Sequence, residues 1–204
     1  MCHRMRPMRR LLLVLGVVVL TAILVVGLRQ AGDRSGDVAE EPPFDLRAAR
    51  AELRGSPPPL AALHEQSGAL LEGGVPAFRK RLRDLRGHPV VINKWASWCD
   101  PCRAEFPALQ RVATDRGREV AFLGLNSGDS LQPARRFLAS FPTPYPSYVD
   151  PDEDIARALE APANYPVTVF LDARGEPAFI HQGAYRSSAD LAADIDRYLG
   201  GDGT

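Results

Sequence analysis

The chain has 204 residues, of which 45% are apolar, and its 25 basic and 25 acidic side chains leave no net charge. A chain of this length and composition can bury a sizeable core and form one globular domain, once any leader is set aside. The charge is uneven, because residues 1–30 contain five arginines and no acidic side chain, which leaves the rest of the chain acidic by five charges. This balance excludes a dominant nucleic-acid-binding surface, so no nucleic-acid partner is expected.

The N-terminal part carries a candidate membrane anchor. Residues 11–28 read LLLVLGVVVLTAILVVGL, without a charged side chain, and as a helix they would extend roughly 27 Å, enough to cross a hydrocarbon core. Because arginines before such a run favour the cytoplasmic side, we expect residues 1–10 to be a cytoplasmic basic segment. The chain is then a single-pass protein of the cell membrane with an extracytoplasmic domain. The alternative is a cleaved signal peptide, but residues 28–31 (LRQA) make a poor cleavage site.

A linker and a globular domain are expected to follow. Residues 29–60 are rich in glycine, proline and charge, which is typical of a flexible linker, with a short helix at residues 45–53. The domain is expected to span residues 61–204 and to include an amphipathic helix at residues 76–86. The apolar side chains of that helix recur at helical spacing, namely Phe78, Leu82 and Leu85.

Strand and helix patterns then alternate along the chain. Short apolar runs, typical of strands buried on both faces, occupy residues 89–95, 120–126 and 167–171. Helical patterns separate them, at residues 104–114, 133–141 and 152–159. A strand at residues 177–181 follows a turn, and a last helix at residues 188–199 begins after Ser187 as its cap. The alternation predicts an α/β domain with a central mixed sheet and flanking helices.

Two of the three cysteines, Cys99 and Cys102, lie in a CxxC motif directly after one of these strands and at the start of a helix. The free backbone N–H groups of a first helical turn and the helix dipole stabilise a thiolate on the first cysteine. Pro101 is tolerated there, because a first-turn N–H has no partner within the helix. Cys102 lies on the same helix face as Cys99 and can close a disulfide with it. The third cysteine, Cys2, is expected on the cytoplasmic side and has no assigned role.

Three interpretations of the pair compete. A zinc site needs two further ligands at suitable spacing, whereas His64, His88 and His181 are isolated from one another. A structural disulfide gains most from closing a long loop, and this loop is minimal. A redox pair fits the strand-to-helix position and an oxidising compartment. The sequence therefore favours redox chemistry, with no metal and no cofactor.

Residues 95–107, WASWCDPCRAEFP, resemble the active-site segment of the TlpA/ResA/DsbE group of membrane-anchored thioredoxin-like thiol–disulfide oxidoreductases. The likeness extends to the final helix and implies a thioredoxin fold. Pro107 is similar to the proline that bends the group's active-site helix, and Tyr165-Pro166 resembles its cis-proline loop, which faces the cysteines. Gly183 resembles a glycine that allows close backbone approach. An additional strand and helix are expected at residues 148–159.

The resemblance also implies roles for neighbouring residues. Glu105 is similar to a glutamate that lies beside the thiols, where a carboxylate opposes thiolate formation and can carry a proton. Asn93 stands where thioredoxin itself has a buried aspartate, so that acid–base role is expected at Glu105 instead. Lys94 differs from the apolar residue that is usual at its position. A buried lysine is costly without a partner, so we expect a carboxylate to pair with it. Trp98 is expected mainly to pack, and also to shield the sulfur atoms.

The group resemblance further implies a reductase. Asp100 between the cysteines supports this direction, because a negative charge beside Cys99 disfavours its thiolate. The implied partners are a protein disulfide substrate, typically apocytochrome c in cytochrome c-type biogenesis, and a membrane-embedded electron donor of the CcdA/DsbD type. One alternative is a copper-handling thioredoxin-fold protein, for which His181 is the candidate additional ligand. Another is a peroxiredoxin-like antioxidant protein, although the setting around a single peroxidatic cysteine is missing.

Overall fold

The computed structural model of the protein describes residues 43–200. Among the helices in this range, none has the length and apolar character needed to cross a bilayer. The expected anchor at residues 11–28, the basic segment before it and Cys2 lie outside the described residues.

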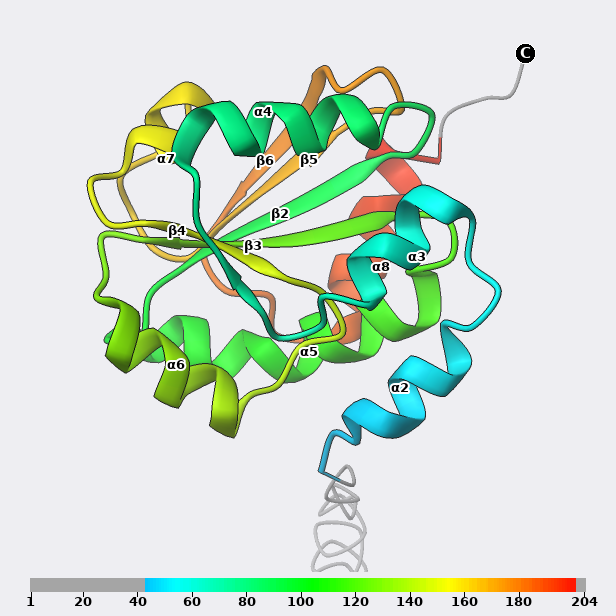
Figure 1. Cartoon of the computed structure of the whole chain (residues 1–204), viewed down its shortest axis with the longest axis horizontal. Coiled ribbons are helices and arrows are strands. Elements are labelled where there is room, and N and C mark those ends of the chain that lie inside the picture. Colours follow the sequence, from blue (N-terminus) through cyan, green and yellow to red (C-terminus); the bar gives the residue numbers. More distant parts are fainter. Residues whose placement is uncertain (1–42, 201–204) are drawn as a thin grey trace, which may run out of the picture. The chain divides into compact units, whose positions relative to one another are not determined.

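A central sheet of six strands organises the described part of the chain, in the order β1-β4-β3-β2-β5-β6 (Figure 1). The strands are β1 (Leu70–Leu71), β2 (Val90–Trp95), β3 (Ala121–Ser127), β4 (Ser147–Asp150), β5 (Val167–Leu171) and β6 (Pro177–Gln182). Strands β1 to β4 pair in parallel, whereas β5 pairs antiparallel with both β2 and β6. The predicted mixed sheet is confirmed.

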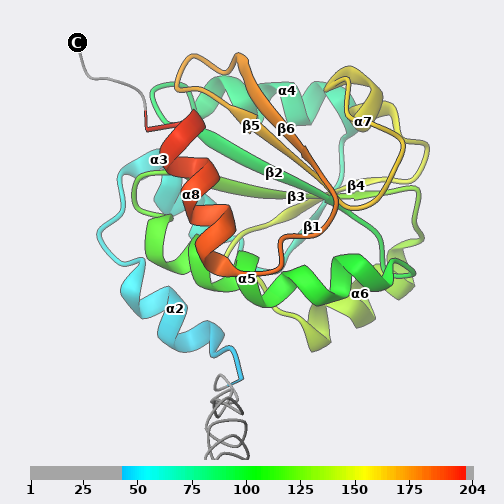
Figure 2. The same ribbon diagram turned by 180° about the vertical axis from the view of Figure 1, so that it is seen from behind.

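Helices cover both faces of this sheet. They are α2 (Leu46–Glu52), α3 (Pro58–His64), α4 (Gly74–Asp84), α5 (Asp100–Arg116), α6 (Leu131–Ser140), α7 (Asp154–Ala158) and α8 (Ser188–Tyr198). One core cluster joins α5, α6 and α8 to one face of the sheet, and a second joins α3, α4 and α7 to the other. Figures 1 and 2 show α4 and α7 on the side of the sheet opposite α5 and α6.

The central strand β2 contributes to both core clusters, because successive side chains of a strand point to opposite faces. Val91 and Trp95 lie in the cluster with α5, whereas Val90 and Ile92 lie in the cluster with α3, α4 and α7. The same alternation sends the polar pair Asn93 and Lys94 to opposite faces. This division determines which helices each of the two polar side chains can reach.

The compact unit begins earlier than the sequence suggested. We expected a flexible linker up to residue 60, but the unit starts at Phe44. The short helix expected at residues 45–53 is present as α2, and the Asp45 side chain caps it by accepting hydrogen bonds from two backbone N–H groups. Ala49 and Leu53 are buried, and α2 contacts α5. Two buried apolar side chains in so short a segment give a weak periodic signal, so the sequence did not show that this segment packs on the domain.

The strand and helix expected within residues 148–159 are both present, as β4 and α7. Strand β4 lies between β1 and β3 in the sheet. Asp150, at the end of β4, accepts hydrogen bonds from the backbone N–H groups of Ile155 (2.9 Å) and Ala156 (3.0 Å) at the start of α7. A buried carboxylate therefore fixes the short helix to the strand before it.

Candidate active site

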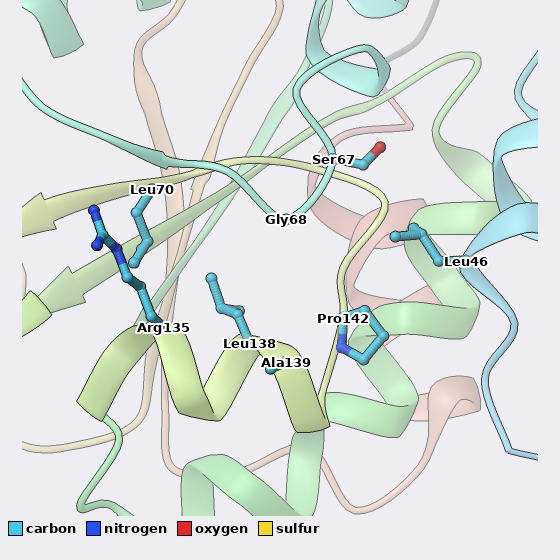
Figure 3. Close-up of a pocket in the computed structure, with 8 residues that line it drawn as sticks. All are labelled: Leu46, Ser67, Gly68, Leu70, Arg135, Leu138, Ala139 and Pro142. Atoms are coloured by element: carbon cyan, nitrogen blue, oxygen red, sulfur yellow. The ribbon is translucent and has the colours of Figure 1, made fainter. Parts of the chain in front are cut away.

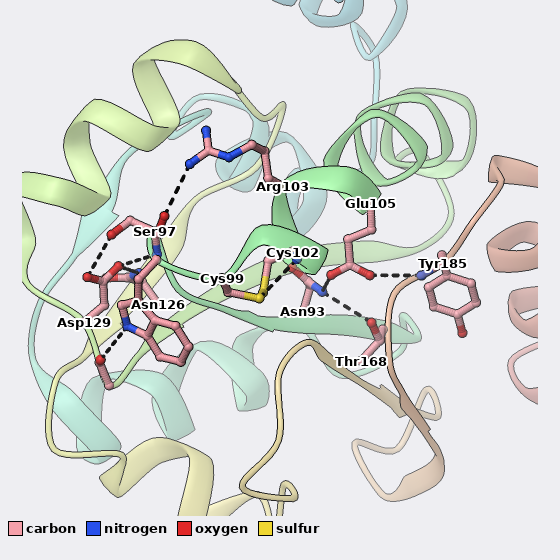
Figure 4. Close-up of a disulfide and its surroundings, with 12 residues drawn as sticks. Asn93, Ser97, Cys99, Cys102, Arg103, Glu105, Asn126, Asp129, Thr168 and Tyr185 are labelled. Atoms are coloured by element: carbon pink, nitrogen blue, oxygen red, sulfur yellow. Dashed lines mark hydrogen bonds between the residues drawn. A yellow bond between two sulfur atoms is a disulfide. The ribbon is translucent and has the colours of Figure 1, made fainter.

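Cys99 and Cys102 form a disulfide at the junction between β2 and α5 (Figure 4). Cys99 is the N-cap of α5, and its sulfur accepts a hydrogen bond of 3.1 Å from the backbone N–H of Cys102. Cys102 is fully buried and Cys99 is 4% exposed. The pair therefore lies at a helix N-terminus, as predicted. A first-turn N–H group that has no acceptor within the helix donates to the sulfur of Cys99.

The loop that leads to Cys99 is held by Asp129, a residue that no sequence motif had identified. Its carboxylate accepts hydrogen bonds from the backbone N–H (2.6 Å) and the hydroxyl (3.0 Å) of Ser97. It also accepts from the side-chain amide of Asn126 (2.8 Å) and the backbone N–H of Ser130 (2.7 Å), and Figure 4 shows it below Ser97. The link spans 32 residues of sequence, so no local pattern could have revealed it.

Glu105 lies one turn after Cys102 on the same helix and is completely buried. Its Oε1 accepts a hydrogen bond of 2.7 Å from the Asn93 side chain, and its Oε2 accepts one of 3.2 Å from the backbone N–H of Tyr185. Burial raises the pKa of Glu105 to about 7, although these two hydrogen bonds act in the opposite direction. The carboxyl group can therefore gain or lose a proton near neutral pH, as a proton carrier beside the cysteines must.

Asp100 and Pro101, between the cysteines, are both exposed. We predicted that the charge of Asp100 opposes thiolate formation on Cys99. Because water and salt screen an exposed charge, this influence is weaker than that of a buried carboxylate. Pro101 occupies the first turn of α5, and Pro107 lies inside the same helix, as expected.

Trp98 differs from the expectation that it mainly packs, because its side chain is 59% exposed. Its indole N–H donates a hydrogen bond of 3.1 Å to the carbonyl of Gly128, and its ring makes an edge contact with Tyr165 at 4.9 Å. Trp95 is instead buried in the core against the rings of Phe106 and Phe137. Of these two tryptophans, Trp98 is therefore the one whose ring is exposed at the surface of the site.

The peptide bond between Tyr165 and Pro166 is cis, as predicted. The contact between Tyr165 and Trp98 places this loop beside the residue that precedes Cys99. The carbonyl of Pro166 accepts a hydrogen bond of 3.0 Å from the backbone N–H of Gly183. The φ of Gly183 is +102°, a backbone conformation that favours glycine, whereas a Cβ there would meet no atom of the described chain within 4 Å.

Lys94 has the partner carboxylate that we expected for a lysine in a central strand. Its ammonium group lies 3.1 Å from Glu153 Oε2 and donates a hydrogen bond of 2.9 Å to the carbonyl of Pro162. The side chain is 1% exposed, so these contacts compensate the cost of burying its charge.

His181, the candidate additional ligand of the copper interpretation, has other neighbours. Its ring stacks on Tyr185 at 4.0 Å, and its Nδ1 lies 3.8 Å from Asp194. Within residues 43–200, no three histidine, cysteine or acidic side chains form a group that could hold a metal ion.

One surface pocket is separate from the cysteine pair (Figure 3). It is lined by Leu46, Ser67, Gly68, Leu70, Arg135, Leu138, Ala139 and Pro142. None of these residues belongs to the site described above.

Together, the sheet topology and the cysteine pair at the start of α5 define the class of protein: it is a thioredoxin-fold thiol–disulfide oxidoreductase. Comparison with known proteins agrees with this class. The family model described as the AhpC/TSA family matches residues 77–178, half of the chain. The chain belongs to this family.

Individual relatives carry the names that the motif suggested. The chain is 40% identical over 93 residues to "Thiol:disulfide interchange protein DsbE" of Pseudomonas fluorescens biotype C, an alignment that covers 45% of this chain and 50% of the relative. It is 26% identical over 135 residues to "Thiol-disulfide oxidoreductase ResA" of Bacillus subtilis (strain 168), covering 66% and 70%. The chain thus spans only half the length of the Pseudomonas protein.

A solved structure shares the fold. The crystal structure of a protein described as a DsbE-type thiol:disulfide interchange protein from Chlorobium tepidum superposes with a TM-score of 0.52 and 27% identity. The superposition covers 58% of this chain and 85% of that one. The resemblance to ResA and DsbE proteins is therefore confirmed.

Proposed function

We propose that this protein reduces disulfides of other proteins outside the cytoplasm, through Cys99 and Cys102. The observation that carries this direction is the buried carboxyl group of Glu105, one turn after Cys102. A negative charge at this place destabilises a nearby thiolate, which makes the reduced pair a better electron donor and the disulfide a weaker oxidant. Strongly oxidising members of the fold depend on the opposite, an unusually stable thiolate.

The proposed cycle begins with the reduced pair. The Cys99 thiolate attacks one sulfur of the substrate disulfide, so that a mixed disulfide forms and the other substrate sulfur leaves as a thiolate and takes up a proton. Cys102 then passes its proton to Glu105 and attacks Cys99. This step closes the Cys99–Cys102 disulfide and releases the second substrate sulfur as a thiolate, which takes up the proton from Glu105 and so restores the carboxylate. Two electrons and two protons reach the substrate.

The exposed ring of Trp98 and the cis-proline loop are the groups best placed to contact the substrate. Trp98 directly precedes Cys99 and its ring is exposed, and the half-buried Tyr165 of the loop contacts that ring. A short peptide segment around a disulfide offers the apolar and backbone groups that such a surface recognises. Following the ResA and DsbE resemblance, we propose the paired haem-binding cysteines of apocytochrome c as the substrate.

We further propose that residues 11–28 anchor the protein in the cell membrane, with residues 1–10 in the cytoplasm. The support is the sequence of this run and its flanking arginines. The oxidised pair would then need a membrane-embedded electron donor of the CcdA/DsbD type, because a cytoplasmic reductase does not reach it. In intact cells, a membrane-impermeant maleimide should modify Cys99 of the reduced protein and leave Cys2 unmodified. Modification of Cys2 in place of Cys99 would contradict this orientation.

Trapping of the substrate tests the function itself. In a Cys2→Ser background, a Cys102→Ser variant should accumulate a mixed disulfide through Cys99, because the resolving thiol is missing. The trapped protein can be identified by mass spectrometry after reduction. The matched control is Cys99→Ser, which should trap nothing. Trapping that survives in this control would overturn the assignment of Cys99 as the nucleophile.

A further inference from the structure

Lys94 is a charged residue at the centre of the sheet that the proposed redox cycle does not use. It lies on β2, one residue before Trp95, and its side chain is 1% exposed. The alternation along β2 points it to the face covered by α3, α4 and α7, opposite Glu105. A buried ammonium group is costly unless its partners are well placed, so its contacts indicate what the residue holds in position.

All three contacts of the Lys94 ammonium group lie in one segment, from the start of α7 to the cis-proline. The group donates a hydrogen bond of 2.9 Å to the carbonyl of Pro162 and lies 3.1 Å from Glu153 Oε2. It also lies 4.0 Å from the centre of the Tyr165 ring. A charge-assisted hydrogen bond, an ion pair and a cation–π contact thus converge on one cation.

Backbone hydrogen bonds hold the loop between α7 and β5, residues 159–166, near its two ends. The backbone N–H of Ala161 donates to the carbonyl of Ala156 at 3.0 Å, and the carbonyl of Pro166 accepts from Gly183 at 3.0 Å. Lys94 contacts the stretch between these two anchors, at Pro162 and Tyr165. It therefore ties the middle of the loop to the central strand.

Tyr165 connects this tie to the candidate active site. Its ring contacts the Lys94 ammonium group and, at 4.9 Å, the exposed ring of Trp98. Tyr165 also precedes the cis peptide bond to Pro166. We propose that Lys94 is a positioning residue, which holds residues 159–166 and the Tyr165 ring against Trp98 so that a peptide disulfide docks beside Cys99. This inference rests on the proposed function.

A comparison of two disulfide substrates tests the role. The full-length protein, in a Cys2→Ser background, is reduced and then mixed either with a synthetic peptide that contains a CxxC disulfide or with 5,5′-dithiobis(2-nitrobenzoate). The aryl disulfide has no peptide backbone to dock. Lys94→Met, which keeps an unbranched side chain, should raise the peptide concentration at half-maximal rate about tenfold. The rate with the aryl disulfide should change less than about twofold.

A spectroscopic signal should follow the same change. Loss of the tie allows the Tyr165 ring to leave Trp98, so acrylamide should quench the fluorescence of Lys94→Met more strongly than that of the wild type. The matched control is Arg81→Met, which removes a half-buried cation that donates to Gln66 (2.7 Å) and to Tyr148 (3.4 Å) away from the site. Arg81→Met should change neither the selectivity between the two substrates nor the quenching.

Three outcomes would overturn the role of Lys94: unchanged kinetics in Lys94→Met, equal losses with both substrates, or the same selectivity change in Arg81→Met. If Lys94→Met does not fold, Glu153→Gln is the second variant, because Glu153 is 37% exposed. It should raise the half-maximal peptide concentration about threefold, and an unchanged value would overturn the proposal. A wild-type protein that reduces neither substrate would instead refute the proposed function, while the quenching comparison would still test the tie.

Discussion

The side-chain amide of Asn93 donates a buried hydrogen bond of 2.7 Å to the carboxyl group of Glu105. This contact joins the central strand β2 to α5, the helix that carries both cysteines. The amide group donates a hydrogen bond but does not titrate, so the titratable group of the pair is the carboxyl group on the helix. The backbone N–H of Tyr185 occupies the other oxygen of the carboxyl group. Glu105 is thus fixed in place while remaining able to titrate.

The first prediction concerns stability as a function of pH. Burial raises the pKa of Glu105 from 4.5 to about 7. Below about pH 4.5 Glu105 is protonated in both the folded and the unfolded chain, so its ionisation does not lower the free energy of unfolding. Between about pH 4.5 and 7 the unfolded chain ionises first, and the free energy of unfolding falls by on the order of 3 kcal/mol. Above about pH 7 the loss is complete.

Glu105→Gln should lack this loss. The difference in unfolding free energy between the variant and the oxidised wild type should therefore rise by on the order of 3 kcal/mol from pH 4.5 to pH 7.5. Urea denaturation across this range measures it. Glu119→Gln, which removes an exposed carboxyl group, should keep the wild-type profile. A difference for Glu105→Gln that is constant with pH would contradict the assigned titration.

The second prediction concerns the reduction potential. Glu105→Gln removes a buried negative charge that disfavours a cysteine thiolate, so the reduced state gains stability and the potential rises. A tenfold change in the thiol–disulfide equilibrium corresponds to about 30 mV, and we expect a rise of at least this size at pH 8. The shift should shrink below pH 7, where Glu105 is protonated in the wild type. Equilibration with dithiothreitol buffers measures both values.

Asp100→Asn is the matched control for charge. Asp100 lies next to Cys99 in sequence, but its side chain is exposed, and solvent and salt screen it. Its removal should shift the potential by less than about 10 mV. A larger shift for Asp100→Asn than for Glu105→Gln would show that the exposed acid, rather than the buried one, sets the direction of the reaction.

The sequence was informative wherever the signal is local. The apolar runs of β2, β3 and β5 predicted strands buried on both faces, and all three are fully buried. The CxxC motif after a strand predicted the N-terminus of a helix, and Cys99 is the N-cap of α5. The resemblance to thioredoxin-like proteins supplied the cis-proline, which no local propensity would have indicated.

Long-range contacts could not be read in the same way. Lys94 reaches Pro162, 68 residues away, and the alternation along β2 decides that it reaches this loop while Asn93 reaches Glu105. The sequence contains the alternation, but not which helix covers which face. The exposure of Trp98 could not be predicted either, because a tryptophan next to a cysteine in sequence gives no indication of whether its ring is buried or exposed.

The third prediction tests the loop before the cysteines. Asp129→Ala removes the acceptor of four hydrogen bonds, two of them from Ser97. Hydrogen bonds to a charged group are worth more than neutral ones, and three of the four donors left behind are partly buried, so we expect a loss of about 2–3 kcal/mol in unfolding free energy. Asp84→Ala, which breaks the exposed ion pair with Lys80, should leave the free energy of unfolding nearly unchanged, because water screens both charges. Equal losses in both variants would show that Asp129 is an ordinary surface acid.

The fourth prediction separates the two tryptophans. Trp98→Ala removes a ring that is 59% exposed and a single hydrogen bond to Gly128, so the free energy of unfolding should fall by less than about 1 kcal/mol. Trp95→Phe alters a ring that is 1% exposed, stacks on Phe137 and donates to Ser147. Although it is the smaller substitution, it should cost more, about 1–3 kcal/mol, through lost packing and an unpaired hydroxyl.

Activity should respond in the opposite order. Trp98→Ala should slow reduction of a peptide disulfide by the reduced full-length protein about tenfold, because the surface beside Cys99 loses its apolar ring. Trp95→Phe should remain within about threefold of the wild type at a temperature where it is folded. Denaturation and stopped-flow reduction of the same samples measure both quantities. A Trp98→Ala variant that is strongly destabilised yet fully active would mean that this ring supports the fold rather than the substrate.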